Sequence, residues 1–390
     1  MTNDLLESAS SRAGDALPPK GAEVFVMPCS ISQQRYWLLE QLSPGNTALN
    51  IPLAVQLSGP LDSSLLERAL NAVVSRHEVL RTSFTLVDGT PRQIIKTEAR
   101  LKLGVIDLED VPAEKRPERI EQEMIAEAAR PLSLTEAPIL RTTLLRLTPK
   151  ENVLMLTIHH IVGDGWSNGL LVREVGLFYD AFLQEKPVPL PALAFHYADY
   201  ALWQQEWLKT PQFQKQFGYW KETLKGNLPA LDMPTDYPRQ MGQTYTAFIE
   251  SLLLPAPLGD ALKRLCVELD VTLFMVLFAT YVALLYRYTG QTEFIIGTTA
   301  ANRNRSEMEH LIGLFANPLI LRPEVSGEMT FRELAVRLRD HSLDGFAHQE
   351  VPFEIILEQL QERRSGARNP VIQTHFLFQK ALWSPPRTAI

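Results

Sequence analysis

Two adjacent histidines, followed closely by an aspartate and a glycine, are the residues of this sequence best suited to chemistry. They are His159, His160, Asp164 and Gly165. An imidazole titrates near neutral pH, so a histidine can take a proton from a nucleophile and release it again. An aspartate in such a turn orients a histidine, pairs with an arginine or bonds its own backbone. The spacing predicts a site of proton transfer, and a hydrogen-bonded core histidine is the simpler alternative.

The elements predicted to position these residues are a buried strand and a helix. Residues 153–158 are an apolar run without a breaker, which is typical of a buried strand ending at the histidines. After the turn, Ser167 is a candidate N-cap for a helix whose apolar residues recur at helical spacing as far as Phe182. Successive side chains of a strand point to opposite faces, so only one histidine can face a given cavity, and the pattern does not say which. Gly165 leaves room for a substrate against the main chain.

Composition limits the class of protein. The 390 residues are 45% hydrophobic, which is enough to bury a sizeable core. The net charge is −7 and no basic stripe predicts nucleic-acid binding. Cys29 and Cys266 have neither metal-ligand spacing nor a disulfide framework, which predicts no metal site and a cytoplasmic location. The N-terminus has no signal-peptide pattern. The apolar run 274–286 is shorter than the ~20 residues of a membrane span, so it predicts a buried helix and no membrane partner.

The order of predicted elements indicates an α/β protein with two lobes. Residues 1–23 are polar and small and predict a flexible tail. Residues 24–186 are expected to form an N-terminal lobe, an open sheet of mixed strand direction with helices and one hairpin closed by an Asp-Gly turn. Residues 187–193 contain three prolines and predict a linker. Residues 194–390 remain for a C-terminal lobe.

The central residues resemble a known family signature. Residues 159–165 read HHIVGDG, which resembles the HHxxxDG motif of condensation domains of non-ribosomal peptide synthetases. Segments similar to six other motifs of that family stand in family order at residues 30–36, 76–84, 197–203, 312–317, 348–354 and 368–371. The sequence is therefore identified as a member of that family.

Two of these motifs depart from the family pattern. Ala316 and Pro318 flank Asn317, where the family commonly has Val and Thr, and Glu350 stands where Asp is usual. The amide of Asn317 can donate and accept hydrogen bonds, so it either orients a substrate amide or serves as a turn residue before proline.

The resemblance implies a fold of two lobes, each like a chloramphenicol-acetyltransferase subunit, arranged as a V around a tunnel. The HHxxxDG motif would lie midway along that tunnel. The family usually continues for some tens of residues beyond its seventh motif, so the C-terminal lobe is expected to be incomplete, which bears on both folding and activity.

The resemblance also implies roles for individual residues. His160, the second histidine, either accepts the proton of an attacking amine or positions that amine. The backbone N–H of Gly165, at a helix start, is the expected donor to an oxyanion. Asp164 is expected to be structural and to pair with Arg76 or Arg81, because arginine forms forked hydrogen bonds to carboxylates.

The function implied is formation of an amide bond between a donor acyl or aminoacyl thioester and the amine of an acceptor aminoacyl thioester. Both substrates would arrive on the phosphopantetheine arms of donor and acceptor peptidyl carrier proteins, with an adenylation domain as a further partner and no cofactor bound to the chain itself. The motifs are most similar to the subtype that joins two L-residues. A non-catalytic module that docks carrier proteins, and a stand-alone CoA-dependent acyltransferase, are the alternatives.

Overall fold

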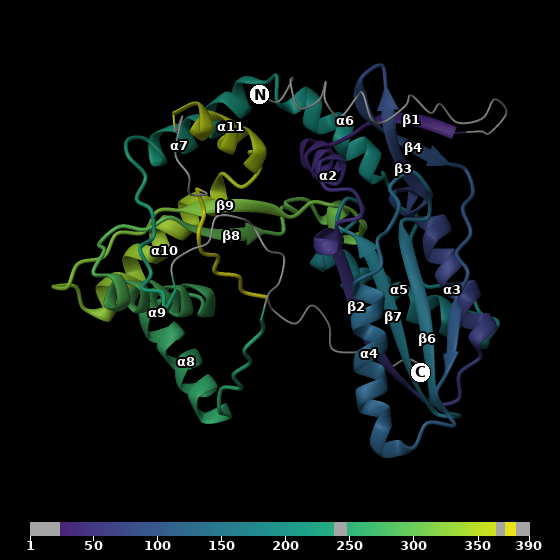
Figure 1. Cartoon of the computed structure of the whole chain (residues 1–390). Coiled ribbons are helices and arrows are strands. Elements are labelled where there is room, and N and C mark those ends of the chain that lie inside the picture. Colours follow the sequence, from purple (N-terminus) through teal and green to yellow (C-terminus); the bar gives the residue numbers. More distant parts are fainter. Residues whose placement is uncertain (1–23, 238–247, 364–370, 380–390) are drawn as a thin grey trace. The chain divides into compact units, whose positions relative to one another are not determined.

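The protein is described by a computed structural model that covers residues 24–237, 248–363 and 371–379. The predicted tail, residues 1–23, lies outside the described residues. The elements fall into two compact units, which are considered separately (Figure 1). Unit 1 comprises residues 24–209 together with 303–316, and unit 2 comprises the described residues of 210–302 and 317–379.

The division into units differs from the predicted one. Residues 187–193 lie inside unit 1. The helix that follows them, α6 (Tyr197–Trp207), belongs to unit 1 as well. Its first residue, Tyr197, is buried and its hydroxyl donates to the carbonyl of Leu314 at 2.7 Å. The aromatic motif of α6 is therefore part of unit 1, whereas the proline pattern predicts that the second lobe begins at residue 194.

A four-stranded sheet at the centre of unit 1 positions the histidines. Its strand order is β2 (Asn50–Ser58), β7 (Glu151–His159), β6 (Leu140–Thr148) and β5 (Gly104–Asp107). The pair β5 and β6 is parallel and the other pairs are antiparallel, so the predicted mixed direction is confirmed. Every residue of β7 except the first is buried, which explains its apolar run without alternation.

Helices cover both faces of this sheet. Leu154, Leu156 and Ile158 of β7 belong to the core shared with α3 (Ser63–Arg76) and α5 (Gly165–Leu183). On the opposite face, Val153 and Met155 belong to a smaller cluster that packs against Ile120 of α4 (Arg116–Ala128). Because both faces are covered, β7 is a rigid support for the turn that follows it.

The second sheet of unit 1 has the order β1 (Val24–Pro28), β4 (Thr90–Lys96) and β3 (Thr82–Val87). The predicted hairpin is confirmed. Its turn residues, Asp88 and Gly89, have φ values of 52° and 70°, as a tight hairpin turn requires.

Helix α2 (Ile31–Leu42) follows β1 and begins with a capping box between Ser30 and Gln33. Short 3₁₀ helices occupy Thr47–Leu49, Glu78–Arg81, Ala113–Lys115 and Ser306–His310.

The described part of unit 2 contains one antiparallel strand pair, β8 (Ile296–Ala300) and β9 (Asn317–Leu321). Residues 371–379 run beside β8, where Gly297 N donates to Thr374 O at 3.0 Å. A single bridge joins these two described segments, so the contact between them is short and parallel. The helices described in unit 2 are α7 (Pro211–Thr223), α8 (Ala256–Leu269), α9 (Leu273–Thr289), α10 (Phe331–Ala347) and α11 (Phe353–Arg363).

Helix α9 contains the long apolar run and contributes residues such as Phe278 and Val282 to the core of unit 2, so the predicted buried helix is confirmed. Among the described residues, no one helix combines the length and apolar character needed to cross a bilayer. The bent pair α8 and α9, which meet at 99°, satisfies that criterion only when counted together. The predicted α/β class is confirmed by both units.

Candidate active site

His159 is the histidine that packs behind the site. It is the last residue of β7 and is only 1% exposed. Its Nδ1 accepts a hydrogen bond from the backbone N–H of Ile161 at 3.1 Å, so in the neutral ring the proton lies on Nε2. Burial lowers the pKa of His159 to about 4, and the neighbouring His160 acts in the same direction. The sequence pattern places His159 among the candidate catalytic residues, but its geometry is that of a neutral support for the turn.

His160 is the more exposed of the two histidines, although its ring Nδ1 is buried. Its side chain is partly exposed, and its backbone N–H donates to Leu49 O at 2.8 Å, which fixes the main chain where β7 ends. Burial is the main cause that lowers the pKa of His160 below the ordinary value, while nearby backbone groups and Asp164 oppose this shift. The shift favours the neutral imidazole, which is the form able to accept a proton.

An aromatic ring that sequence reasoning did not assign to the site covers His160. Tyr36 of α2 stacks on the imidazole, with ring centroids 5.1 Å apart and planes inclined by 28°. The first motif was identified by its resemblance alone, because an amphipathic helix with an aromatic residue carries no signal that separates a site from a core. Only the fold brings Tyr36 to the end of β7.

Asp164 is a structural anchor at the start of α5. It is the N-cap of α5 and is 1% exposed. Its Oδ1 accepts from the backbone N–H of Ser167 at 2.9 Å and from the Ser167 hydroxyl at 2.8 Å. Its Oδ2 accepts from the backbone N–H groups of Phe315 and Ala316, both at 3.1 Å. Through these bonds Asp164 connects α5 to the segment 303–316.

The cationic partner of Asp164 is Arg303, and the predicted pairing with Arg76 or Arg81 is wrong. Arg303 Nη2 lies 3.2 Å from Asp164 Oδ1, and both side chains are almost fully buried. Arg303 also donates to Leu311 O at 2.7 Å. Burial lowers the pKa of Arg303, and the nearby Asp164 opposes the shift, as expected for a desolvated ion pair.

Arg76 and Arg81 are used elsewhere in unit 1. Arg76 pairs with Glu174 of α5 at 3.3 Å, and the same carboxylate lies 2.8 Å from Nε2 of His77. Arg81 pairs with Glu78 at 3.1 Å and donates to Lys96 O. The reason for the error is geometric. The end of α3 faces the middle of α5, where Glu174 lies, and Asp164 at the start of α5 faces the segment 303–316.

The segment 303–316, from a distant part of the sequence, holds the start of α5 in place. Gly313 N donates to the Ser167 hydroxyl at 3.1 Å, and Gly313 O lies 3.0 Å from the same hydroxyl oxygen. A side chain at Gly313 would meet Tyr197 Cδ2 at 2.1 Å, so the close approach of α6 requires glycine. The polar run that contains Arg303 was visible in the sequence, but nothing local linked it to Asp164.

Asn317 does not have the substrate role that was one of its two predicted alternatives. Its side chain lies in unit 2 and is buried. The amide nitrogen donates to Gln349 O at 2.8 Å and to Val351 O at 2.7 Å, and the amide oxygen accepts from Phe353 N at 3.0 Å. Since both hydrogens and the oxygen already have partners, Asn317 organises the turn before α11 and is not available to a substrate amide.

Gly165 is the first residue of α5 and is exposed. The first N–H groups of a helix have no intrahelical acceptor and lie at its positive end, so this position suits a developing negative charge. His160 and Gly165 thus lie at the two ends of one turn. The buried residues His159 and Asp164 hold that turn in place.

Gly163 makes this turn possible because a side chain there would collide with the core. An added Cβ would lie 2.6 Å from Ile158 Cδ1 and 3.3 Å from Ser167 Cβ. We expect Gly163→Ala to lower the free energy of unfolding by about 1–3 kcal/mol, as overpacking does. Urea denaturation measures this. The Ile158→Val change removes the clashing methyl, so the double variant is expected to lose less than the sum of the two single losses. Simple additivity would contradict the clash.

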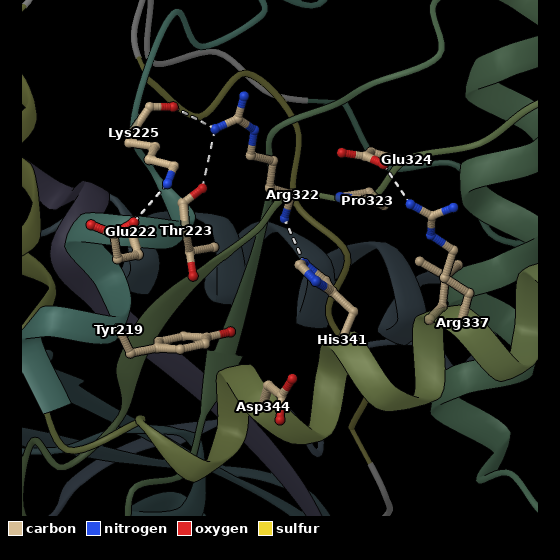
Figure 2. Close-up of a pocket in the computed structure, with 11 residues that line it drawn as sticks. Tyr219, Glu222, Thr223, Lys225, Arg322, Pro323, Glu324, Arg337, His341 and Asp344 are labelled. Atoms are coloured by element: carbon tan, nitrogen blue, oxygen red, sulfur yellow. Dashed lines mark hydrogen bonds and ion pairs between the residues drawn. The ribbon is translucent and has the colours of Figure 1, made fainter.

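A separate cavity of about 610 Å³ lies in unit 2, between the end of α7, the residues after β9 and α10. Figure 2 shows that its basic side chains are bound within the protein. Arg337 pairs with Glu324, Lys225 lies 2.7 Å from Glu222, and Arg322 donates to Lys225 O at 2.7 Å. The residues that line this cavity include none of the predicted site residues, so it is not the candidate active site. Within the described ranges, no cluster of His, Cys, Asp and Glu has the arrangement of a metal site.

Comparison with known proteins agrees with the motifs. A sequence model of the family described as Condensation domain matches residues 25–389. The chain belongs to this family. This condensation domain is 43% identical to a linear gramicidin synthase of Brevibacillus parabrevis over 90% of its length, and 38% identical to surfactin synthase subunit 1 of Bacillus subtilis over 91%. It spans only 7% and 10% of those relatives, respectively.

Solved structures share the fold of this condensation domain. The X-domain from teicoplanin biosynthesis superposes with a TM-score of 0.77 at 29% identity, covering 93% of this chain and 78% of that one. The SgcC5 protein from Streptomyces globisporus gives a TM-score of 0.72 at 31% identity, covering 87% and 77%. The first condensation domain of the CDA synthetase gives 0.78 at 21% identity, covering 90% and 80%, which concerns the fold alone. The family predicted from the seven motifs is confirmed.

Proposed function

We propose that this condensation domain joins a donor acyl or aminoacyl thioester to the amine of an acceptor aminoacyl thioester, with both substrates on the phosphopantetheine arms of peptidyl carrier proteins. The observation that carries the proposal is His160, a partly exposed histidine whose pKa is lowered, at one end of a turn whose other end starts helix α5. The names of relatives, which include gramicidin and surfactin synthases and a phosphinothricin tripeptide synthetase, support a peptide product.

The protein needs to lower the activation barrier only moderately, because a thioester is already activated towards attack by an amine. Bringing the amine and the carbonyl together in a productive orientation supplies up to ~7–11 kcal/mol of the barrier reduction. The amine attacks the thioester carbon, a C–N bond forms, and the carbonyl oxygen becomes an oxyanion. The backbone N–H of Gly165 is the proposed donor to that oxygen. The C–S bond then breaks and the carrier thiol leaves.

The proton of the attacking amine is the second requirement. Neutral His160 accepts it, or orients the amine while the proton passes to the departing thiolate; in both cases the proton ends on the thiol. In this proposal Asp164 takes no proton, because its carboxylate is engaged by Arg303, Ser167 and the backbone of residues 315–316. The phosphopantetheine arms belong to the carrier proteins, which are loaded by an adenylation domain.

The test is a reconstituted condensation assay. The chain is mixed with two carrier proteins, one charged with a panel of aminoacyl donors and one with a panel of aminoacyl acceptors, and the carriers are analysed by intact-protein mass spectrometry. Peptidyl product on the acceptor carrier is the expected result. Carrier binding without product across the whole panel supports the docking-module alternative, and product from aminoacyl-CoA donors alone supports the CoA-dependent acyltransferase. Either outcome overturns the proposal.

A further inference from the structure

Helix α2 is attached to the turn that carries His160. The side chain of Gln33 is fully buried and its amide donates to Ile161 O and to Gln93 Oε1, both at 3.3 Å. Gln93 of β4 in turn donates to Pro28 O at 2.7 Å. The first turn of α2 is therefore fixed both to the second sheet and to the residue directly after His160.

Tyr36 extends this attachment to the imidazole itself. It follows Gln33 by one helical turn, so both side chains lie on the same face of α2. The Tyr36 ring stacks on His160 at 5.1 Å between centroids. We infer that Tyr36 is a positioning residue, which sets the orientation of the His160 imidazole and shields one face of it from water. This inference rests on the proposed function and adds a residue to its site.

The need for such a residue follows from the contacts of His160. The bond from its backbone N–H to Leu49 O fixes the main chain, and backbone groups of His160 and Gly163 bond to the ring itself. Such bonds lie in the plane of the imidazole, so they do not cover its faces. A base must lie within hydrogen-bonding reach of the proton that it removes, so a contact on the face of the ring adds to the backbone bonds in keeping the productive orientation. Stacked rings at this separation attract each other and exclude water from the shared face.

Within the described part of the chain, three titratable or charged groups besides Tyr36 interact with the His160 ring. Asp164 in the turn and Arg35 on α2 act on its pKa, and His159 at the end of β7 is the neighbour whose own pKa His160 lowers. Burial is the largest influence and lowers the pKa of His160; Arg35 acts in the same direction, and Asp164 opposes it. Removing the Tyr36 ring hydrates the imidazole, so the pKa is expected to rise toward its ordinary value and more of the base is protonated near neutral pH.

The experiment compares Tyr36→Ala, Tyr36→Phe and Leu39→Ala. Leu39 is an exposed residue of the same helix, so its variant measures any general effect on α2. For Tyr36→Ala we expect kcat to fall about tenfold or more with little change in the KM for the acceptor carrier, and the acid limb of the pH–rate profile to move to higher pH. Tyr36→Phe keeps the ring and is expected to stay within about twofold of the parent, as is Leu39→Ala.

A second measurement separates failure of this inference from failure of the proposed function. Selectively labelled histidine and NMR give the pKa of His160 without any substrate, with the signal assigned by the His160→Gln variant. A rise in that pKa in Tyr36→Ala, and not in Tyr36→Phe, supports the inference even if no condensation is detected. An unchanged or lower pKa, or equal losses in Tyr36→Phe and Tyr36→Ala, overturns it.

Discussion

The His160→Ala variant is expected to form dipeptide at least about 100-fold more slowly than the parent chain while keeping its fold. The magnitude is that of a lost general acid or base, which contributes about 10²–10⁴-fold. His160 is the more exposed histidine of the motif, whereas His159 is buried with its Nδ1 bonded to the backbone. Single-turnover transfer between two loaded carriers, stopped with acid and analysed by mass spectrometry, measures the rate directly.

The matched control for this experiment is His310→Ala. His310 is an exposed histidine in the 3₁₀ helix Ser306–His310 and lies outside the central motif. Its replacement is expected to leave the transfer rate unchanged. Circular dichroism of both variants checks that the fold persists. Undiminished product from a folded His160→Ala chain would remove this residue from the reaction and leave proximity alone as the source of acceleration.

Asp164→Asn is expected to lower the free energy of unfolding by about 3–5 kcal/mol, the usual cost of removing one member of a buried ion pair. The variant leaves Arg303 desolvated without a counter-charge. It also replaces one carboxylate oxygen with an NH₂ group that faces donors, because both oxygens of Asp164 accept hydrogen bonds. Chemical denaturation followed by fluorescence measures the change.

Two comparisons make this result specific. Asp260→Asn removes an exposed ion pair with Lys263 on α8 and is expected to cost less than about 1 kcal/mol. The Arg303→Met change in the Asp164→Asn background is expected to cost less than it does alone, because the partner has already gone. Full stability of Asp164→Asn together with lost turnover would instead assign this carboxylate to the chemistry.

The sequence predicted those parts of the fold and site that depend on neighbouring residues. The apolar run before the histidines became β7, the Asp-Gly pair closed a hairpin, and the run 274–286 became the buried α9. These features are set by periodicity and by the backbone freedom of particular residues, which a single sequence displays. The family resemblance supplied the fold and the candidate site.

What could not be predicted was which distant residues meet. Arg303 and Asp164 are 139 residues apart, and any of several arginines satisfied the chemistry of the pair. The pairing of Arg76 with Asp164 was predicted wrongly because charge complementarity does not show which turn of α5 faces α3. Asn317 is a second example. Its amide group is chemically suited to bind a substrate, but in the fold it bonds to the backbone of residues 349–353.

The placement of residues 303–316 in unit 1 bears on how the chain is made. A protein emerging from the ribosome exposes its early portions first, and compact units usually fold as they are completed. Here the anchor of Asp164 is encoded more than a hundred codons downstream, after most of unit 2. We therefore expect unit 1 to complete its folding only after residues 303–316 have emerged, because until then Asp164 lacks Arg303 and the backbone donors of residues 315–316.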